Sequence, residues 1–537
     1  MIKPAALLVF AALILAPLAH SQTFPKSVQK QAEERSSYPG TLSPNAAPPV
    51  PQSLADRRAA LNDILTQLWQ DHLARHPLFA SVSGDHHYDT DLPDYSVSAW
   101  NAALDSGRRD LLRLGVIDTT GMTPEESLSD ALAVRYLVAQ QQAAEYKPWQ
   151  MPITPYSGPQ INLIHALPQL RFSTVDDYDN YAARLSKLPA AIRQATNAAS
   201  FGIEEGRVPP KFLLQQVLTQ VNAIGHSKPE DTPFAAPLKS FPASISTADR
   251  KRITDEILTA IRTQVQPAYV LFGLFLSRTY VPAGRANAGI WSIPAGDAYY
   301  AFLVNQSTTT TLTPQQVHQL ALHQVAQDEA AMLALAQKLG LADLSALRHA
   351  VSGNYRFQAY ASQELSDIYK SALPAIPSTL PPFRRYARYP AFMDGWALYI
   401  GTTSTTTDPY QRLGLLELDR YHAALAVADT GIHALQWTRQ QAVDYVVAHT
   451  MLANAPDTVA SAMEGVDRVI AQPAQSLGAT IGEIEFTQLR AQAQQSLGPK
   501  FSLSAFNQAV LASGPLPMDL LQQHIEHWIA AQKGSSE

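Results

Sequence analysis

Apolar residues recur at helical spacing from the first segment that has the composition of a folded domain. Leu61, Ile64 and Leu65 lie three or four residues apart or side by side, which places them on one face of a helix. Ser53 suits the N-cap of this helix, and Asp56 suits the third helical position of a capping box. The pattern therefore predicts that the folded part of the chain begins with a helix at residue 53.

The same kind of helix start returns further along the chain. A threonine followed directly by a proline begins the segments 123–126 and 313–316, as expected for an N-cap followed by proline at the first helical position. Residues 247–280 favour one long helix. Pro267 is expected to kink or break it, because proline removes a backbone hydrogen bond.

Strand signals are few. The clearest is residues 291–304, where the turn residues 294–297 (Pro-Ala-Gly-Asp) separate two short apolar runs. Glycine is scarce, and alanine, leucine and glutamine are abundant, which favours helix over sheet. The sequence therefore predicts an all-α body over residues 53–534, with at most a small sheet and with room for two lobes.

The N-terminus resembles a secretory signal. Lys3 precedes an apolar run at residues 5–15, and Ala19 and Ser21 fit a cleavage site before Gln22. An uncleaved membrane anchor is the alternative, but the run is shorter than the ~20 residues that span a bilayer. Residues 22–52 are rich in proline and polar residues and are expected to be a disordered linker. We expect an exported protein, periplasmic or secreted, with no integral membrane segment after cleavage.

Composition excludes several classes of partner and site. The chain has 46 acidic and 40 basic side chains and a formal charge of -6, so no basic surplus points to nucleic acid. It has no cysteine, which excludes disulfides, thiolate ligands, a cysteine nucleophile and a lipid-modified cysteine anchor.

The common metal and nucleophile motifs are missing from the sequence. None of the 15 histidines lies in an H-E-x-x-H arrangement, and no G-x-S-x-G segment occurs. His524 and His527 could share a helical face, although a solvated face is the simpler interpretation. His318 and His323 are five residues apart and are expected on different faces. The polar segment 85–91 lacks the glycine and the terminal glutamate of an EF-hand, so its aspartates are expected to cap turns.

Four segments in order resemble a bacterial family called domain of unknown function 885. Residues 392–399 (Phe-Met-Asp-Gly-Trp-Ala-Leu-Tyr) are similar to its F-x-E-G-W-A-L-Y-x-E motif, and residues 429–433 (Asp-Thr-Gly-Ile-His), followed by Trp437, resemble its D-T-G-I-H…W segment. Residues 291–318 and the tail 473–517 also follow the family pattern. The resemblance implies an exported, helical, gluzincin-like peptidase scaffold. It also implies zinc, held by histidines of an H-E-x-x-P-G-H-H segment and by the first glutamate of the E-G-W-A-L-Y motif.

The chain departs from this pattern at the residues that carry the chemistry. The H-E-x-x-P-G-H-H segment is missing, as though deleted near residues 375–380. Asp394 replaces the first motif glutamate and Gly401 the second. In the tail, Ala479 and Thr480 occupy the positions of a Tyr-Lys pair in the family pattern, and Asn507 occupies that of a histidine. We therefore expect no bound cofactor and no zinc peptidase activity.

The remaining motif residues have modest expected roles. Trp396 and Tyr399, one helical turn apart, are expected to pack in the core or to line a pocket with Asp429 and His318. Asp394 alone is a poor zinc site, because zinc takes several ligands.

Three hypotheses follow from these residues. The first is a catalytically inactive peptidase-like protein that binds a peptide or an active relative. The second is a metal-dependent hydrolase with a site rebuilt from Asp394 and His433, with His318 as a third candidate. The third is a degenerate relative whose shortened core is unstable.

Overall fold

The computed structural model describes residues 53–451 and 455–534, and this part of the chain is helical. It contains no β-strand, and its one isolated bridge joins Pro210 to Arg285. The all-α prediction is therefore confirmed. The predicted signal peptide (residues 1–21) and linker (residues 22–52) lie outside the described residues. None of the described helices is long and apolar enough to cross a bilayer.

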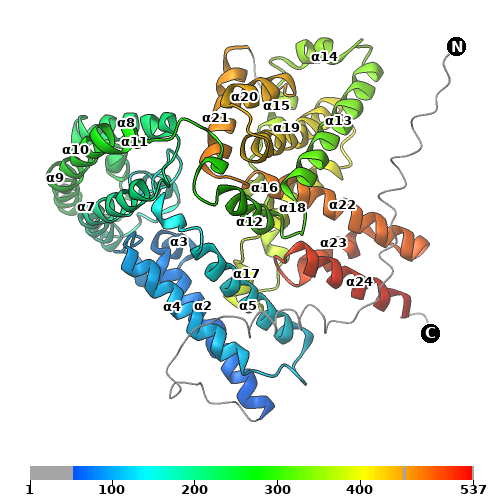
Figure 1. The fold of residues 1–537 in the computed structure, drawn as a ribbon, viewed down its shortest axis with the longest axis horizontal. Coiled ribbons are helices and arrows are strands. Elements are labelled where there is room, and N and C mark those ends of the chain that lie inside the picture. Colours follow the sequence, from blue (N-terminus) through cyan, green and yellow to red (C-terminus); the bar gives the residue numbers. More distant parts are fainter. Residues whose placement is uncertain (1–52, 452–454, 535–537) are drawn as a thin grey trace.

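The N-terminal half forms one end of the molecule in Figure 1. One apolar core joins the helices between residues 153 and 281, and a separate, smaller core joins the long helices of residues 54–144. Its helices are α2 (Leu54–Arg75), α3 (Pro77–Ser83), α4 (Val97–Gly115), α5 (Pro124–Ala144), α6 (Asn162–Ala166), α7 (Val175–Glu204), α8 (Lys211–Gly225), α9 (Thr247–Ala260), α10 (Gln266–Phe275) and α11 (Val281–Ala283).

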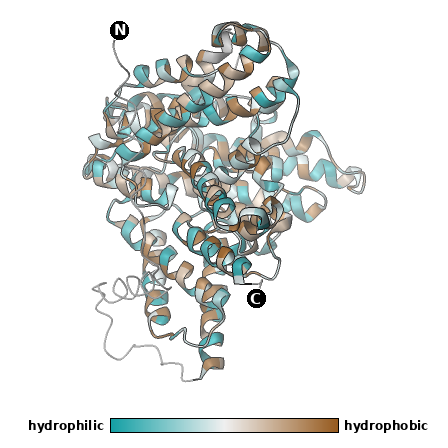
Figure 2. Ribbon diagram, turned by 90° about the vertical axis from the view of Figure 1, so that its right-hand side faces the viewer, coloured by the Kyte–Doolittle hydropathy of each residue, from teal (hydrophilic) through white to brown (hydrophobic). Residues whose placement is uncertain are grey.

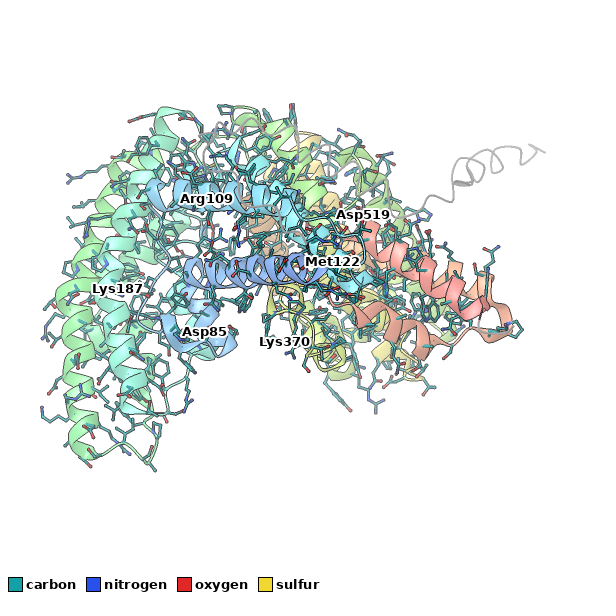
Figure 3. The ribbon with its side chains drawn as sticks, turned by 90° about the horizontal axis from the view of Figure 1, so that it is seen from below. Asp85, Arg109, Met122, Lys187, Lys370 and Asp519 are labelled. Carbon is teal, nitrogen blue, oxygen red and sulfur yellow. The ribbon has the colours of Figure 1, made fainter. Side chains whose placement is uncertain are left out.

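The C-terminal half packs around α19, most of whose residues are buried and none of which is exposed. Seen from below, the two halves give the molecule the outline of an arch, with α2 across its centre (Figure 3). The helices are α12 (Gly296–Thr308), α13 (Pro314–Lys338), α14 (Leu344–Val351), α15 (Tyr355–Ala361), α16 (Leu365–Lys370), α17 (Pro382–Arg385), α18 (Pro390–Thr402), α19 (Pro409–Ala434), α20 (Arg439–Ala448), α21 (Ala455–Ala471), α22 (Leu477–Leu497), α23 (Leu503–Ala512) and α24 (Met518–Gly534).

The local sequence signals for helix starts are confirmed. Ser53, Thr123 and Thr313 each cap a helix with a complete capping box. Hydrophobic and hydrophilic residues mix along most helices, as Figure 2 shows. Amphipathic helices of this kind bury one face and leave the other in water.

The long helix predicted at residues 247–280 is present, but its irregularities differ from a simple proline kink. Two π-helical turns, Ile261–Val265 and Leu276–Tyr280, interrupt it on either side of α10. Pro267 lies just after the first of them. The wider π turn changes the hydrogen-bond register there, so the helix continues past the proline.

The strand signal at residues 291–304 was wrong. The chain forms a 3-10 turn at Ile290–Ser292 and then α12. Ala295 adopts a left-handed conformation with φ of 53°, and a Cβ on Gly296 would lie 2.0 Å from the carbonyl oxygen of Ile290. The Pro-Ala-Gly-Asp turn therefore folds a helix start against the preceding turn, and the buried residues of α12 follow helical spacing.

Two helices of the C-terminal half, α18 and α22, touch backbone to backbone. A Cβ on Gly395 would lie 2.5 Å from the Cα of Gly482, and a Cβ on Gly482 would lie 1.8 Å from the carbonyl oxygen of Ala391. The rings of Trp396 and Tyr399 then pack on Phe486 of α22, with centroids 5.4 and 5.7 Å away.

Buried carboxyl groups from three helices form a second feature of this core. Asp328 of α13, Asp419 of α19 and Glu483 of α22 are 4%, 1% and 5% exposed. The side-chain amide of Gln324 donates hydrogen bonds to Asp328 (3.1 Å) and Asp419 (3.2 Å). Burial, reinforced by the charge of Glu483, raises the pKa of Asp328 to about 8. Burial and the neighbouring carboxylates also raise the pKa of Asp419.

The glycine contact predicts a large stability loss for Gly482→Ala. The added methyl group must push α18 away from α22, and such overpacking costs about 1–3 kcal/mol or more. Gly401→Ala on α18 is the matched control, because its Cβ would meet only a leucine methyl group at 3.4 Å. We expect the control to unfold within about 1 kcal/mol of the parent protein. Urea unfolding followed by circular dichroism measures both, and equal midpoints would contradict the contact.

The carboxyl cluster of Asp328, Asp419 and Glu483 predicts that stability falls as pH rises. A carboxyl group whose folded-state pKa is raised favours folding at low pH, and this contribution is lost between its unfolded pKa, about 4, and its folded value. For Asp328 that window ends at about 8. Asp419→Asn should therefore stabilise the protein by roughly 2 kcal/mol at pH 8 and by less at pH 5.

The control for this pH experiment is Asp255→Asn on α9, which removes an exposed carboxylate. Its unfolding free energy should follow that of the parent protein at each pH. A constant difference between Asp419→Asn and the parent across this range would show that the cluster does not titrate as described.

Candidate functional site

A groove of about 1260 Å³ opens in the C-terminal half between α14–α16 on one side and α18, α19, α21 and α22 on the other. Its walls combine apolar and charged side chains from segments far apart in the sequence. The apolar ones include Val351, Phe357, Leu365, Leu418, Leu425, Val447 and Val469, and the ionisable ones are Arg348, His349, Glu364, Asp394, Tyr421, His422, Glu464 and Arg468.

Asp394 is the motif residue that lines this groove. It is half-buried on α18, one residue before the glycine that touches α22. Within the described residues its carboxylate makes no hydrogen bond and no ion pair. Burial raises its pKa to about 6, and the positive charge of Arg388 opposes this increase only in part. Asp394 is therefore a carboxyl group that lacks a close partner.

The groups near Asp394 do little to stabilise its negative charge. The Arg388 guanidinium lies over the ring of Phe79, 5.8 Å from its centroid, and makes no ion pair with Asp394. Tyr369 of α16 is 3% exposed, and its hydroxyl has no hydrogen-bond partner in the described part of the chain. Burial, followed by the charge of Asp394, raises the pKa of this hydroxyl.

His422 on α19 is the functional candidate that sequence reasoning missed. It lines the groove, and burial lowers its pKa to about 4, which keeps the imidazole neutral near pH 7. Glu464 and Arg468 of α21 line the same groove. No local motif marks these residues, because their relation to Asp394 arises from helix packing over long sequence separations.

Asp429 lies in the core and holds α19 to two other segments. Its carboxylate accepts hydrogen bonds from the Tyr300 hydroxyl (2.8 Å), the Ser476 hydroxyl (2.8 Å) and the Ala474 backbone N–H (3.0 Å). Burial raises its pKa to about 7, and these hydrogen bonds oppose the increase. Asp429 thus fixes α12 and the start of α22 against α19.

His433 also lies in the core, with both ring nitrogens hydrogen-bonded. Its Nδ1 accepts a hydrogen bond from the Ile290 backbone N–H (2.9 Å), so Nε2 carries the proton and donates to the Val469 carbonyl (3.0 Å). Burial lowers its pKa to about 3. With both nitrogens bonded to backbone groups, His433 has none left for a metal or a proton transfer.

His318 lies beside the same motif segment and also has a hydrogen-bond partner. The Thr430 hydroxyl donates to the Ala426 carbonyl (2.7 Å), so it accepts from His318 Nδ1 at 2.7 Å. The imidazole meets the face of Trp437 edge to face, with ring centroids 5.7 Å apart. Neither His318 nor His433 lines the groove with Asp394.

Trp396 and Tyr399 lie in the α18–α22 core, 2% and 0% exposed. The Tyr399 hydroxyl is 3.2 Å from the side-chain oxygen of Asn507 and donates to it. Neither ring lines the groove.

The other residues that the sequence suggested as metal ligands show no shared site in the described part of the chain. His524 donates to the Ala509 carbonyl (3.0 Å), and His323 is exposed whereas His318 is buried. In the segment 85–91, Asp85 accepts from the His87 backbone N–H at 3.1 Å.

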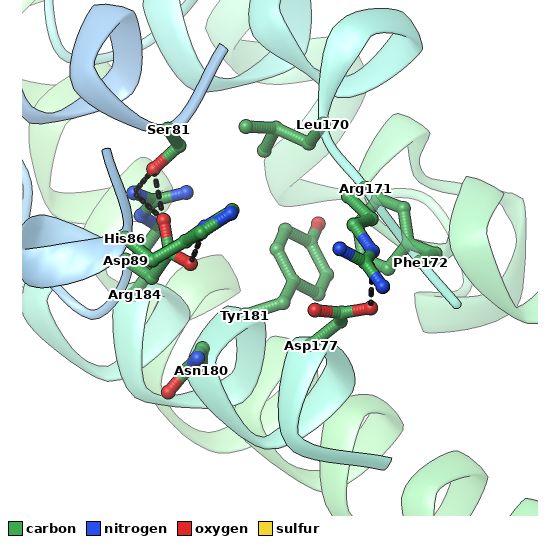
Figure 4. A pocket seen from close by; sticks show the side chains of 10 residues that line it. All are labelled: Ser81, His86, Asp89, Leu170, Arg171, Phe172, Asp177, Asn180, Tyr181 and Arg184. Carbon is green, nitrogen blue, oxygen red and sulfur yellow. Dashed lines mark hydrogen bonds and ion pairs between the residues drawn. The ribbon is translucent and has the colours of Figure 1, made fainter. Parts of the chain in front are cut away.

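Arg184 of α7 ties this segment to the N-terminal half. It donates to the carbonyl oxygens of Tyr88 (2.9 Å) and Asp91 (3.1 Å). Asp89 accepts from His86 (2.8 Å) beside it, in the small hollow of Figure 4. These contacts cap and anchor the segment.

Two solved structures have the same fold as this chain. A putative lipoprotein from Colwellia psychrerythraea is 20% identical, with a TM-score of 0.74 over 88% of this chain and 99% of that one. A putative lipoprotein of unknown function from Shewanella oneidensis is 16% identical, with a TM-score of 0.60 over the same shares. Both share the fold. No curated protein matches the chain.

A family model matches the chain in two segments, residues 77–380 and 375–525. The segments meet at residues 375–380, between the 3-10 turn Leu373–Ala375 and α17. The match covers most of the chain, and the resemblance seen in its motifs is confirmed. The chain belongs to the family of bacterial proteins of unknown function called domain of unknown function 885.

Proposed function

We propose that this chain is an exported, catalytically inactive member of its family that binds a peptide in the groove beside Asp394. The observation that carries the proposal is the groove itself, which is wide, lined by both apolar and charged residues, and contains an unpaired carboxyl group. Its volume of about 1260 Å³ exceeds the ~300–1,000 Å³ of most small-molecule pockets.

The lining of the groove suits a peptide. Apolar residues such as Phe357, Leu418 and Val469 can bury side chains, and polar residues such as Gln363 and Gln472 can bond to a peptide backbone. A peptide is therefore preferred here over an active relative as the partner.

The residues around Asp394 do not fit the zinc site that the family resemblance implies. A catalytic zinc ion takes three protein ligands within about 2 Å, usually including imidazoles. Asp394 supplies one carboxylate, and the charged group acting on it is the cation Arg388. His318 and His433 are hydrogen-bonded in the core. This arrangement favours binding over a hydrolase rebuilt from Asp394 and His433.

Two further observations support an exported role without zinc chemistry. The two solved proteins that share the fold are named as putative lipoproteins, and residues 1–21 of this chain have the pattern of a secretory signal. The two matched segments of the family model overlap at residues 375–380, which is the place where the family resemblance implies the H-E-x-x-P-G-H-H segment.

Filling the groove should abolish peptide binding. Ser461 is an exposed residue of α21 that lines the groove, and Met463, two residues on, does not line it. We expect Ser461→Trp to lower the affinity for peptides of a casein digest at least about tenfold, and Met463→Trp to leave it unchanged. Equilibrium dialysis with mass spectrometry of the retained peptides measures this.

The same samples test for inactivity. We expect the retained peptides to keep their masses after long incubation with the protein and zinc. Cleavage that depends on zinc and is lost in Asp394→Ala would overturn the proposal in favour of the hydrolase. Equal binding by both tryptophan variants would place the peptide elsewhere.

A further inference from the structure

Asp394 is a half-buried carboxyl group in the wall of the groove that has no hydrogen-bond or ion-pair partner among the described residues. Buried carboxylates normally accept hydrogen bonds or pair with a cation, because an isolated charge is costly in a medium of low dielectric. Asp429, also in the C-terminal half, accepts hydrogen bonds from Tyr300, Ser476 and Ala474. Asp394 has no such partner within the described residues, although it faces a space large enough for a ligand.

The elements packed around Asp394 leave this charge unpaired. The helices α16, α19 and α22 pack against α18, and no hydrogen bond or ion pair joins a donor of their side chains to Asp394 in the described residues. The hydroxyl of Tyr369 is buried and has no hydrogen-bond partner in the described residues. Burial raises its pKa, and the charge of Asp394 raises it further. Arg388 acts on Asp394 from a distance while lying over Phe79.

We propose that Asp394 is the specificity residue of the groove and binds a protonated amine of the peptide. This inference rests on the proposed function. An ammonium group has three donors on a compact head. The carboxylate of Asp394 can accept a hydrogen bond from it, and water in the groove can accept from the other donors.

The amine can be the N-terminus of the peptide or a lysine side chain, and both present the same chemistry to Asp394.

Binding of an amine should depend on pH with a defined sign. Burial raises the pKa of Asp394 to about 6, so the carboxylate forms as pH rises through this value while the amine stays protonated. Among the other groups that line the groove, burial lowers the pKa of His422 to about 4 and raises the pKa of Tyr421. His349 also lines the groove, so the comparison with Asp394→Asn is needed to assign a rise in binding to Asp394.

The test compares three pools of casein peptides on the chain from Gln22 onward, which is the form expected after signal cleavage. The first pool is an unmodified tryptic digest. In the second, all amines are acetylated after digestion. In the third, lysines are acetylated before digestion, so that only the N-terminal amines remain free. Equilibrium dialysis with mass spectrometry measures the retained peptides for each pool.

We expect acetylation of all amines to lower retention by about tenfold. Retention of the third pool at the level of the first assigns the amine to the N-terminus, and its loss assigns the amine to lysine. Asp394→Asn should retain the unmodified pool as weakly as the acetylated one, with no rise between pH 5 and pH 7. Asp367→Asn on the exposed face of α16 is the matched control.

Two results would overturn the inference, and they are distinguishable. Equal retention of the first and second pools by the parent protein would show that peptides bind without an amine contact, which leaves the proposed function intact. Retention of no pool at all would remove the proposed function and this inference together. The acetylation comparison uses the parent protein and does not depend on the folding of Asp394→Asn.

Discussion

The close contact between α18 and α22 positions the rest of the C-terminal half. Gly395 and Gly482 allow these helices to touch through their backbones, and this contact fixes the rotation of α18 about its axis. Trp396 and Tyr399 then enter the core against Phe486, and Asp394 is left in the wall of the groove. A larger residue at either glycine would therefore move the core and the groove together.

The motif residues that this chain retains stabilise the packing of α19. Asp429, Gly431 and His433 all hold α19 in place: Asp429 and His433 through hydrogen bonds to neighbouring segments, and Gly431 through contact with Trp437. A D-T-G-I-H segment resembles a catalytic motif because it contains an acid and a histidine. In this fold both side chains satisfy buried backbone and hydroxyl groups, as buried polar groups must.

Much of the helical fold could be predicted from local sequence, because a cap or an apolar repeat acts within a few residues. The capping boxes at Ser53, Thr123 and Thr313 are examples. The strand prediction at residues 291–304 failed because a left-handed Ala295 and a tightly packed Gly296 start a helix where a hairpin turn was expected. Local propensity does not contain that tertiary contact.

The candidate site was only partly predictable. Asp394 was found through the family motif, but His422, Glu464 and Arg468 were not, because they line one groove with Asp394 only after the surrounding helices have packed. Sequence spacing has no information about such a site. The hydrogen bonds of His433 could not be predicted from the sequence either, since its partners Ile290 and Val469 are far from it in the chain.

The central claim is that Asp394 lies in a groove for a ligand and not in a metal centre. The most direct measurement is the zinc content of the purified chain from Gln22 onward, the form expected after signal cleavage, following incubation with zinc and desalting. The account predicts no stoichiometric zinc, because a zinc site takes at least three protein ligands and no three histidine or acidic side chains of the described residues are grouped closely enough to supply them. One equivalent of zinc, lost in Asp394→Ala, would contradict it and show that this groove is a metal site.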